Sequence, residues 1–355
     1  MRLEDLRKKV DEIDTRLVEL ISERINMAAE IGGEKRKQGK QIDDNEREGT
    51  VLEHVRSLAQ CKRISEEDIE IIYQQIMRVC KQIQGKMVAF QGEIGAYSEE
   101  AASQFFGSSI QPKPCESLDE VFKVVEQDEV SFGVVPVENS LEGSISRTYD
   151  LLLDSSIKVY GEIELRVVHC LIGIPQARLD LVKMVYSHPQ ALGQCKNFLR
   201  QLGCELIPTY DTAGSVKIIK EKGTPNSGAI AGARAADIYG MKVLAREIED
   251  HPNNFTRFFI LSKHDSPPSG NDKTSIVFSV KHKPGALYES LNELAVRKIN
   301  LTKIESRPTR QKPWEYNFYL DLEGHREDKV SQEALESLEN KSLFVKVLGS
   351  YPKAR

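Results

Sequence analysis

The sequence predicts a multidomain protein built from an all-helical segment, an α/β body of two units and a C-terminal βαββαβ domain. Three observations support this fold class. Apolar residues recur at steps of three and four through residues 1–85, which is the helical period. Short apolar runs alternate with helical patterns over 86–263, as they do in open α/β sheets. A stretch rich in Ser, Pro and Gly at 264–272 then reads as a linker before the last block, 273–355.

Length and composition limit the functional classes to which this protein can belong. At 355 residues the chain can hold two or three domains with their own cores. The net charge of −5 offers no basic footprint for nucleic acid, and no apolar run approaches the roughly 20 residues that span a membrane. Six cysteines without a CxxC pair indicate reduced thiols in a cytoplasmic protein. The histidines show no metal-ligand spacing and no nucleotide-binding glycine motif is present, so we expect no cofactor and no metal.

The helical segment opens with a long amphipathic helix. Its apolar period predicts a helix over 3–37, about 50 Å long at 1.5 Å per residue. Such a helix is too long for a compact segment of this size, so we expect it to pack against a partner chain. Further helices are predicted at 45–59 and at 66–84, the latter opened by the capping box at Ser65.

Two cations lie on the apolar side of the first helix. Arg24 and Lys35 are eleven residues apart, close to three turns, and Arg24 continues the apolar seam of Val10 and Leu17. Inward-facing cations are costly unless an anion meets them. A solvated charged face, an interchain salt bridge and an anion-binding site all explain this pattern.

The whole helical segment is similar to the all-helical chorismate mutases. The similarity is carried by the runs 6–14 and 44–48, by Glu23-Arg24 and by Lys35. In that family two chains pair their long helices and share two active sites, which implies a homodimer acting on chorismate. The resemblance brings Arg7 of one chain to the site residues of the other chain, which are Arg24, Lys35, Asp44, Arg47, Glu48, Cys80 and Gln84.

The implied mutase reaction rearranges chorismate to prephenate without a base or a nucleophile. It requires a dianion held in a compact conformer, and donors where charge develops on the breaking ether oxygen. Arginines suit the carboxylates, and Lys35 and Gln84 suit the ether oxygen. Asp44 or Glu48 can accept from the substrate hydroxyl. Cys80 stands where the family often has Ser, which weakens one secondary hydrogen bond.

Polar residues in the α/β body follow predicted strands. A buried strand is expected at 258–261, with Thr256 and Arg257 at its start; an arginine can clamp a carboxylate at two points. Strands at 132–137 and 184–187 also end in polar turns. A further strand is expected at 167–174, and helices are expected at 191–202 and at 213–221, the latter capped by Asp211. Ligands of open α/β sheets bind at such edges, so we predict a site in the cleft between the two units.

The stretches 135–145, 187–195 and 254–261 together resemble the signature of the prephenate dehydratases, and the resemblance extends over 86–263. It implies that Thr256 is the essential threonine of that family. Taken singly, Ser, Thr and Asp at helix starts are as well explained as N-caps. The resemblance implies further site residues at Ser98, Glu138, Asn139, Ser140, Ser187, Gln194, Asp211, Thr212 and Arg257.

The implied dehydratase reaction converts prephenate to phenylpyruvate, CO2 and water, driven by aromatisation. A donor must assist the leaving hydroxyl, and Thr256 is the candidate. Because its own pKa is far too high for a free acid, we expect it to act by hydrogen bonding or relay. The stretch 91–101 is also similar to plant arogenate dehydratases, so an arogenate-preferring enzyme is an alternative.

The last block predicts strands and helices in the order βαββαβ, a ferredoxin-like arrangement. Its stretches 283–288 and 304–308 resemble the paired motifs of the ACT domain in phenylalanine-inhibited dehydratases. The resemblance implies that L-phenylalanine binds between paired subunits as an allosteric inhibitor. The motif residues are Gly285, Ala286, Leu287, Tyr288, Glu305, Ser306, Arg307 and Pro308.

The three resemblances together imply a bifunctional enzyme of phenylalanine biosynthesis that forms a homodimer or a tetramer. Its partners would be the small molecules chorismate, prephenate and L-phenylalanine, with neither nucleic acid nor a membrane. The alternative outside the enzymes is a non-catalytic regulator that senses an amino acid. The charged residues between 7 and 48, together with Thr256, argue against that alternative.

Overall fold

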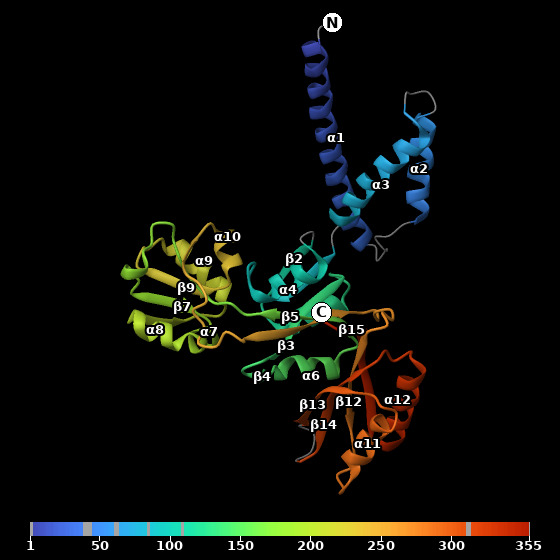
Figure 1. The fold of residues 1–355 in the computed structure, drawn as a ribbon, viewed down its shortest axis with the longest axis vertical. Coiled ribbons are helices and arrows are strands. Elements are labelled where there is room, and N and C mark those ends of the chain that lie inside the picture. The colour runs from blue at the N-terminus through green and yellow to red at the C-terminus, as the bar shows by residue number, and fades with distance from the viewer. Residues whose placement is uncertain are drawn as a thin grey trace. The chain divides into compact units, whose positions relative to one another are not determined.

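The computed structural model describes residues 3–37, 45–59, 64–83, 86–107, 110–309 and 314–354. The chain divides into two compact units (Figure 1). One unit holds the N-terminal helices, within Met1–Met87 and Phe106–Gln111, and the other holds the rest of the chain. Each unit is described separately below.

Three helices form the N-terminal unit: α1 (Leu3–Lys37), α2 (Asn45–Ala59) and α3 (Glu66–Ile83). They confirm the three helices predicted from the apolar period. The predicted capping box opens α3, because the Ser65 hydroxyl accepts from the backbone N–H of Asp68 at 2.9 Å. None of the helices within the described ranges is long and apolar enough to cross a membrane.

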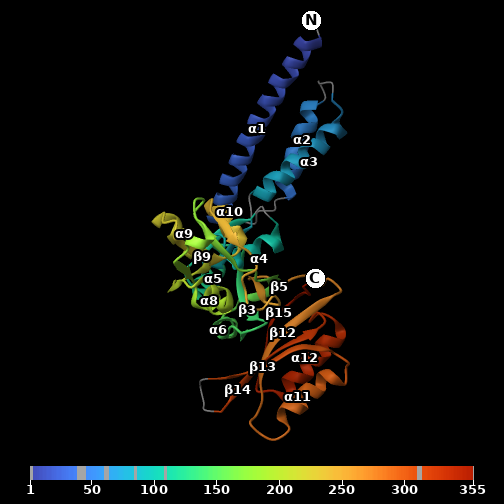
Figure 2. The ribbon, with the colours of Figure 1, turned by 60° about the vertical axis from the view of Figure 1, so that its left-hand side comes forward.

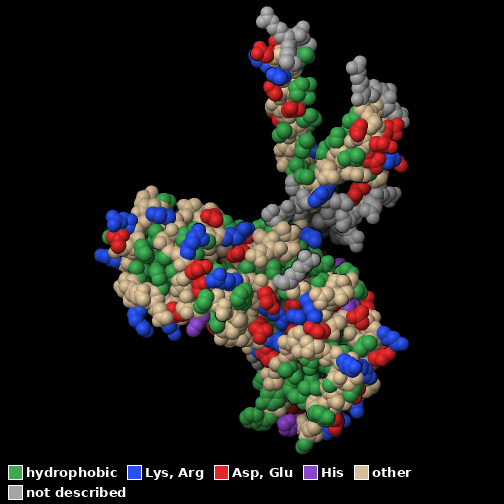
Figure 3. Space-filling model, viewed as in Figure 1, with side chains coloured by type: hydrophobic (Ala, Val, Ile, Leu, Met, Phe, Trp, Pro, Cys, Tyr) green, Lys and Arg blue, Asp and Glu red, His purple; other side chains and the backbone are tan. Residues whose placement is uncertain are grey.

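The apolar stripe of α1 is exposed along most of its length, and Figure 3 shows hydrophobic side chains following the helix. Few of the described residues of this unit are buried, among them Ala28, Val55 and Cys80. Within its own unit, this helix of 35 residues therefore leaves an apolar stripe uncovered. The exposed apolar residues of α1 are Leu6, Val10, Ile13, Leu17, Val18, Leu20, Met27 and Ile31.

The first sheet of the α/β body has the strand order β2-β1-β3-β11-β5, with β4 also paired to β3. β1 and β3 run parallel, whereas β11 runs antiparallel to β3 and β5 and lies between them. β11, from the end of the body, is thereby inserted beside β3, from its beginning. The elements are β1 (Met87–Gln91), α4 (Tyr97–Phe106), β2 (Gln111–Cys115), α5 (Leu118–Glu126), β3 (Phe132–Asn139), β4 (Gly143–Ser144), α6 (Ser146–Asp154), β5 (Lys158–Arg166) and β11 (Phe255–Ser262).

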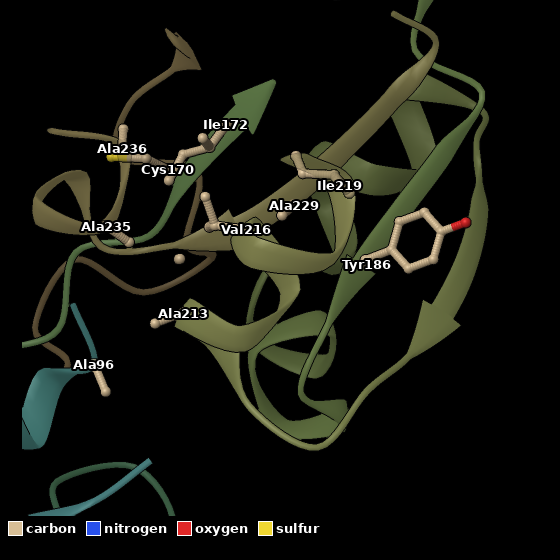
Figure 4. Close-up of a cluster of buried hydrophobic side chains, with 11 residues drawn as sticks. Ala96, Cys170, Ile172, Tyr186, Ala213, Val216, Ile219, Ala229, Ala235 and Ala236 are labelled. Carbon is tan, nitrogen blue, oxygen red and sulfur yellow. The ribbon is translucent and has the colours of Figure 1, made fainter. Parts of the chain in front are cut away.

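The second sheet of the body has the order β10-β6-β9-β7-β8. Its core includes Val216, Ile219 and Ala229, and Figure 4 shows that Ala96 from the first half of the body joins this cluster. The body therefore contains the two predicted α/β units. The elements are β6 (Cys170–Gly173), β7 (Met184–Ser187), α7 (Pro189–Gln194), α8 (Lys196–Leu202), β8 (Glu205–Pro208), α9 (Thr212–Lys222), β9 (Ser227–Ala231), α10 (Ala233–Tyr239) and β10 (Lys242–Ala245).

The C-terminal domain has the predicted βαββαβ order and a sheet arranged β13-β14-β12-β15. Helices α11 and α12 pack side by side against this sheet (Figure 2). Gly285, immediately before α11, has a φ of +81°, a conformation that favours glycine. The elements are β12 (Asp272–Ser279), α11 (Ala286–Ala295), β13 (Leu301–Pro308), β14 (Tyr316–Glu323), α12 (Lys329–Lys341) and β15 (Phe344–Pro352).

Two local predictions were wrong. The strand expected at 167–174 is confined to β6, and β5 before it was not anticipated. β5 carries Glu162, a residue unfavourable in a buried strand by itself, but Arg257 and Lys273 form ion pairs with this carboxylate. The helix expected at 191–202 is two helices, which meet at Cys195, where the backbone leaves the helical range.

Candidate active site

Thr256 and Asn139 lie opposite each other on paired strands. The antiparallel register of β11 and β3 aligns these two residues. The Asn139 Nδ2 group donates to Thr256 Oγ1 at 3.0 Å. Both residues are buried, with exposed fractions of 9% for Thr256 and 5% for Asn139. Two predicted site residues that are 117 positions apart in the chain are therefore in direct contact.

The backbone fixes the orientation of the Asn139 amide. Its Oδ1 accepts from the backbone N–H groups of Leu141 at 3.0 Å and Glu142 at 3.1 Å. Its Nδ2 therefore faces Thr256 and also donates to Asn254 Oδ1 at 2.7 Å. Since the Thr256 oxygen accepts from Asn139, its own hydrogen is available, and no residue in the described ranges accepts it. This hydroxyl can donate to a ligand.

A chain of polar side chains continues from Asn254. Asn254 Nδ2 donates to Gln194 Oε1 at 2.8 Å, and Gln194 Nε2 donates to Glu142 Oε1 at 2.9 Å. Gln194 Oε1 also contacts His169 Nε2 at 2.9 Å. The prediction included Gln194 but not Asn254, although Asn254 lies within the stretch 254–261 that carries the resemblance. These contacts link the stretch 254–261 to the stretches 187–195 and 135–145, which carry the same resemblance.

His169 was missed by the sequence analysis. It is 2% exposed, and its Nδ1 lies 3.0 Å from the Tyr97 hydroxyl, which also donates to the Val168 carbonyl at 2.7 Å. Burial lowers the pKa of His169 and favours the neutral ring, against a hydrogen bond with Gln194 and the charge of Glu249. A single histidine in the connection between two strands has no spacing pattern, so the sequence contained no signal for it.

Arg257 does not join this group. Its side chain donates from Nε to Glu162 Oε2 and from Nη1 to Asp321 Oδ2, both at 2.7 Å. Tyr351 provides a third contact at 3.1 Å. Arg257 follows Thr256 on one strand, and successive side chains of a strand point to opposite faces. The structure thus places Arg257 in a buried ion-pair cluster with the C-terminal domain, away from Thr256.

Glu138 also faces the C-terminal domain, where Lys303 Nζ lies 2.8 Å from its Oε2. Lys303 is the first of three alternate residues of β13 whose side chains contact the body. Glu305 accepts from Ser144, and Arg307 forms an ion pair with Asp150 at 3.0 Å. The predicted allosteric residues Glu305 and Arg307 therefore contact the body. Ser306 and Pro308, the other two residues of that motif, are exposed.

The first ACT-like motif lies at the start of α11. Ala286 is buried and Leu287 is partly buried, whereas Tyr288 is 73% exposed. The positive φ of Gly285 shapes the turn before them. The motif therefore presents one large aromatic side chain outward.

Other predicted residues have structural contacts. The buried Ser187 hydroxyl donates to the Ile230 carbonyl at 2.7 Å. Ser140 Oγ donates to the Asn253 carbonyl at 3.0 Å and accepts from the backbone of β11 at 2.9 Å. Ser98 and Thr212 lie in the first turns of α4 and α9.

Asp211 is the N-cap of α9, as predicted for that helix. Its Oδ2 accepts from the backbone N–H of Gly214 at 2.9 Å. The same oxygen lies 3.4 Å from the backbone nitrogen of Glu93 in the first half of the body. Burial raises the pKa of Asp211, and its backbone hydrogen bonds oppose that change. This carboxylate therefore connects the two halves of the body.

In the N-terminal unit, Arg24 and Cys80 are brought together. Arg24 Nη1 donates to Cys80 Sγ at 2.8 Å across the contact of α1 and α3. Arg7 and Arg47 are exposed, and Glu48 is partly buried. The predicted residues Asp44 and Gln84 and the side chain of Lys35 lie outside the described residues.

A surface hollow of about 320 Å³ lies beside α8. Asn197, Phe198, Gln201 and residues 245–250 line it, and none of the predicted site residues does. Across the described ranges, no cluster of His, Cys, Asp and Glu has the arrangement needed to hold a metal ion.

Three family models match successive parts of the chain: chorismate mutase type II at residues 6–85, prephenate dehydratase at 88–266 and the ACT domain at 274–340. The bifunctional chorismate mutase/prephenate dehydratase of Aquifex aeolicus is 40% identical over 360 residues, which cover 99% of this chain and 98% of that protein.

Two further similarities each cover three quarters of the chain. Arogenate dehydratase/prephenate dehydratase 2 of Arabidopsis thaliana is 44% identical over 276 residues, covering 75% of this chain and 72% of that protein. The crystal structure of prephenate dehydratase from Arthrobacter aurescens in complex with L-Phe superposes with a TM-score of 0.69 at 30% identity. That match covers 75% of this chain and 89% of the other.

Proposed function

This chain belongs to the family of bifunctional chorismate mutase/prephenate dehydratases, and from that premise we propose how its residues perform the two activities. It is an enzyme with chorismate mutase and prephenate dehydratase activity. The first reaction converts chorismate to prephenate. The second takes up one proton and converts prephenate to phenylpyruvate, CO2 and water. The alternative of a non-catalytic regulator is contradicted by this membership.

Thr256 is the donor to the leaving hydroxyl of prephenate. The contact that supports this role is the hydrogen bond from Asn139 Nδ2 to Thr256 Oγ1, because it leaves the threonine hydrogen for a ligand. As the carboxylate leaves as CO2, the electrons of its C–C bond enter the ring and the C4–O bond breaks. Negative charge develops on that oxygen, where a positioned donor is most effective.

The Thr256→Val variant tests this role, since valine keeps the shape and removes the hydroxyl. Loss of one such donor is expected to lower the kcat of prephenate dehydration about 100- to 1000-fold. Chorismate mutase activity of the same preparation is the internal control and should be unchanged. Thr256→Ser should retain more activity than Thr256→Val. Wild-type dehydration by Thr256→Val would remove Thr256 from the mechanism.

We do not propose Arg257 as a ligand of a substrate carboxylate. Its guanidinium is engaged by Glu162 and Asp321, and its side chain is 10% exposed. Asn139 and Gln194 remain the proposed polar neighbours of the substrate beside Thr256. Their connected hydrogen bonds support a preorganised site.

The mutase site is shared by two chains of a homodimer. The exposed apolar stripe of α1 supports this assembly, because a second long helix can cover it. Arg7 of one chain then completes the site of the other, where Lys35 and Gln84 bind the ether oxygen. The remaining proposed ligands of the dianion are Arg24, Asp44, Arg47, Glu48 and Cys80.

L-Phenylalanine is the inhibitor that binds the C-terminal domain. The related Arthrobacter aurescens enzyme is crystallised with L-Phe, which supports the choice of ligand. The turn at Gly285 and the exposed Tyr288 support a ligand site completed by a second copy of the domain. Isothermal titration with phenylalanine and tyrosine, on the wild type and on Gly285→Val, measures the affinity and its selectivity.

Arogenate is the alternative substrate of the dehydratase. The 44% identity to a plant arogenate dehydratase/prephenate dehydratase favours testing it. The ratio of kcat/KM for prephenate and arogenate separates the two possibilities, and we expect the ratio to favour prephenate because a fused mutase supplies that compound. The cytoplasmic location stays a prediction.

A further inference from the structure

His169 lies where the chain crosses between the two sheets of the body. Residues 167–169 join β5 to β6, and residues 246–254 return from β10 to β11. The two crossings are hydrogen-bonded to each other. The backbone N–H of Val167 donates to the Asn254 carbonyl at 2.8 Å, and that of Ile248 donates to the His169 carbonyl at 3.1 Å. His169 and Asn254 therefore belong to the same junction.

The direction of each hydrogen bond in this junction follows from the backbone. Leu141 and Glu142 donate their backbone N–H groups to Asn139 Oδ1, and a backbone N–H can only donate. Asn139 Nδ2 must then donate, and its acceptors are Asn254 Oδ1 at 2.7 Å, Thr256 Oγ1 at 3.0 Å and the Phe255 carbonyl at 3.2 Å. Asn254 therefore presents its own Nδ2 to Gln194.

The same logic determines the state of His169. Gln194 receives the Asn254 donor at its Oε1, so the ring nitrogen that lies 2.9 Å from the same oxygen must carry a hydrogen. In the neutral ring, His169 is thus protonated on Nε2, and its Nδ1 is an acceptor. The Tyr97 hydroxyl lies 3.0 Å from Nδ1 and 2.7 Å from the Val168 carbonyl, and its single hydrogen can serve only one of these two acceptors.

We propose that His169 is a positioning residue for the dehydratase reaction. Its Nε2–H holds the Gln194 amide in place, and the hydrogen bonds through Asn254 and Asn139 then keep Thr256 where its hydrogen can reach the leaving hydroxyl. This inference rests on the proposed role of Thr256. His169 itself does not touch the reacting atoms in this mechanism.

Removing the His169 donor leaves Gln194 Oε1 with one donor, Asn254 Nδ2, while Gln194 Nε2 still donates to the exposed Glu142 carboxylate. The backbone N–H groups of Leu141 and Glu142 still orient the Asn139 amide, so the direction of the hydrogen bonds does not change. The Gln194 side chain loses one of its three hydrogen bonds. Gln194 and Asn254 then hold Asn139 and Thr256 less firmly in position.

A matched pair of variants separates this role from packing. In His169→Gln the amide nitrogen can occupy the position of Nε2 and still donate to Gln194. In His169→Asn the shorter side chain reaches only the position of Nδ1. We expect His169→Asn to lower the kcat of prephenate dehydration about 10- to 100-fold with KM near the wild-type value. His169→Gln should stay within a few-fold of the wild type.

The mutase activity of each preparation and a cooperative thermal melt show that the variants are folded. A double-mutant cycle provides the second readout. In a Gln194→Met background the path from His169 is already broken, so His169→Asn should lower kcat further by less than about twofold. A purely structural role would give the same decrease in both backgrounds.

Thr256→Val is assayed in parallel to keep the two proposals distinguishable. If Thr256→Val is inactive while His169→Asn keeps wild-type kcat, the positioning role is wrong and the role of Thr256 stands. Equal loss in His169→Asn and His169→Gln, or additive effects in the cycle, also overturns the positioning role. If Thr256→Val dehydrates prephenate at the wild-type rate, both proposals are wrong.

Discussion

Thr256 and Arg257 are adjacent on β11 and serve opposite faces of the first sheet. Thr256 contacts Asn139, whereas Arg257 forms ion pairs with Glu162 and with Asp321 of the C-terminal domain. β3 repeats this arrangement, because Glu138 directly precedes Asn139 on that strand and pairs with Lys303 of the C-terminal domain. Successive side chains of a strand point to opposite faces of the sheet. On both strands, a residue of the candidate active site is therefore directly followed or preceded by a residue that contacts the C-terminal domain.

Breaking the Glu138–Lys303 ion pair should weaken inhibition by phenylalanine. The inhibitor can act only through contacts that differ between two states, and this pair joins the C-terminal domain to the residue beside Asn139. We expect Lys303→Met to raise the phenylalanine concentration for half-inhibition about tenfold, which corresponds to about 1.4 kcal/mol. This concentration is measured from the initial rates of prephenate dehydration at increasing concentrations of phenylalanine.

Lys353→Met is the matched control, since Lys353 pairs with Glu323 inside the C-terminal domain. It should be inhibited like the wild type. Unchanged inhibition of Lys303→Met, at equal phenylalanine affinity, would show that this ion pair does not carry the coupling.

Arg257→Met should strongly destabilise the unit that contains the body and the C-terminal domain. It leaves the buried carboxylates of Glu162 and Asp321 without their main cation, although Lys273 still pairs with Glu162. Breaking a buried pair from one side costs about 3–5 kcal/mol. Urea unfolding followed by circular dichroism measures the change in free energy.

Arg147→Met provides the exposed counterpart. Arg147 pairs with Asp119 at the surface, where solvent screens the charges, so its loss should change the free energy of unfolding far less than Arg257→Met does. Equal effects of the two substitutions would contradict the buried cluster as a source of stability.

Acid should destabilise the body through His169. Burial lowers the pKa of His169 in the folded state, so below the unfolded-state pKa of about 6.5 the unfolded chain binds a proton that the folded chain resists. Stability is full above that pH and falls as pH drops below it. Tyr97 and Glu249 face the ring, and the Glu249 charge reduces the effect.

The measurement is the free energy of unfolding from pH 8 to pH 5 for the wild type and His169→Gln. The wild type should lose more stability over this interval than the variant, which has no ionisable group at that position. Parallel pH dependence of the two proteins would mean that His169 is readily protonated in the folded state.

Hybrid dimers should restore mutase activity from two inactive variants. Arg7→Ala and Lys35→Ala chains each lack one residue of the proposed shared site. A mixed dimer holds one site with both residues intact, so random exchange should recover about a quarter of the wild-type rate. Chorismate consumption is measured after subunit exchange has been verified by mass-tagged chains. No recovery would argue for a site within one chain.

Local pattern in the sequence determined the helices of the N-terminal unit and the βαββαβ order of the last domain. The start of α3 at Ser65 and the cap of α9 at Asp211 were also predictable, because both depend on hydrogen bonds within three residues. Apolar period and capping act over a few residues, so the printed sequence contains them in full. The motif resemblance likewise identified Thr256, Asn139 and Gln194, which the structure brings into one network.

Tertiary structure decided where the remaining polar side chains point. Arg257 stands beside Thr256 in the sequence, yet its partners Glu162 and Asp321 are 95 and 64 residues away, and no local pattern specifies them. Strand β5 buries Glu162, whose carboxylate forms ion pairs with Arg257 and Lys273. His169 has a role only because two chain crossings meet. Such contacts depend on which strands become neighbours, and that is settled by the packing of the whole body.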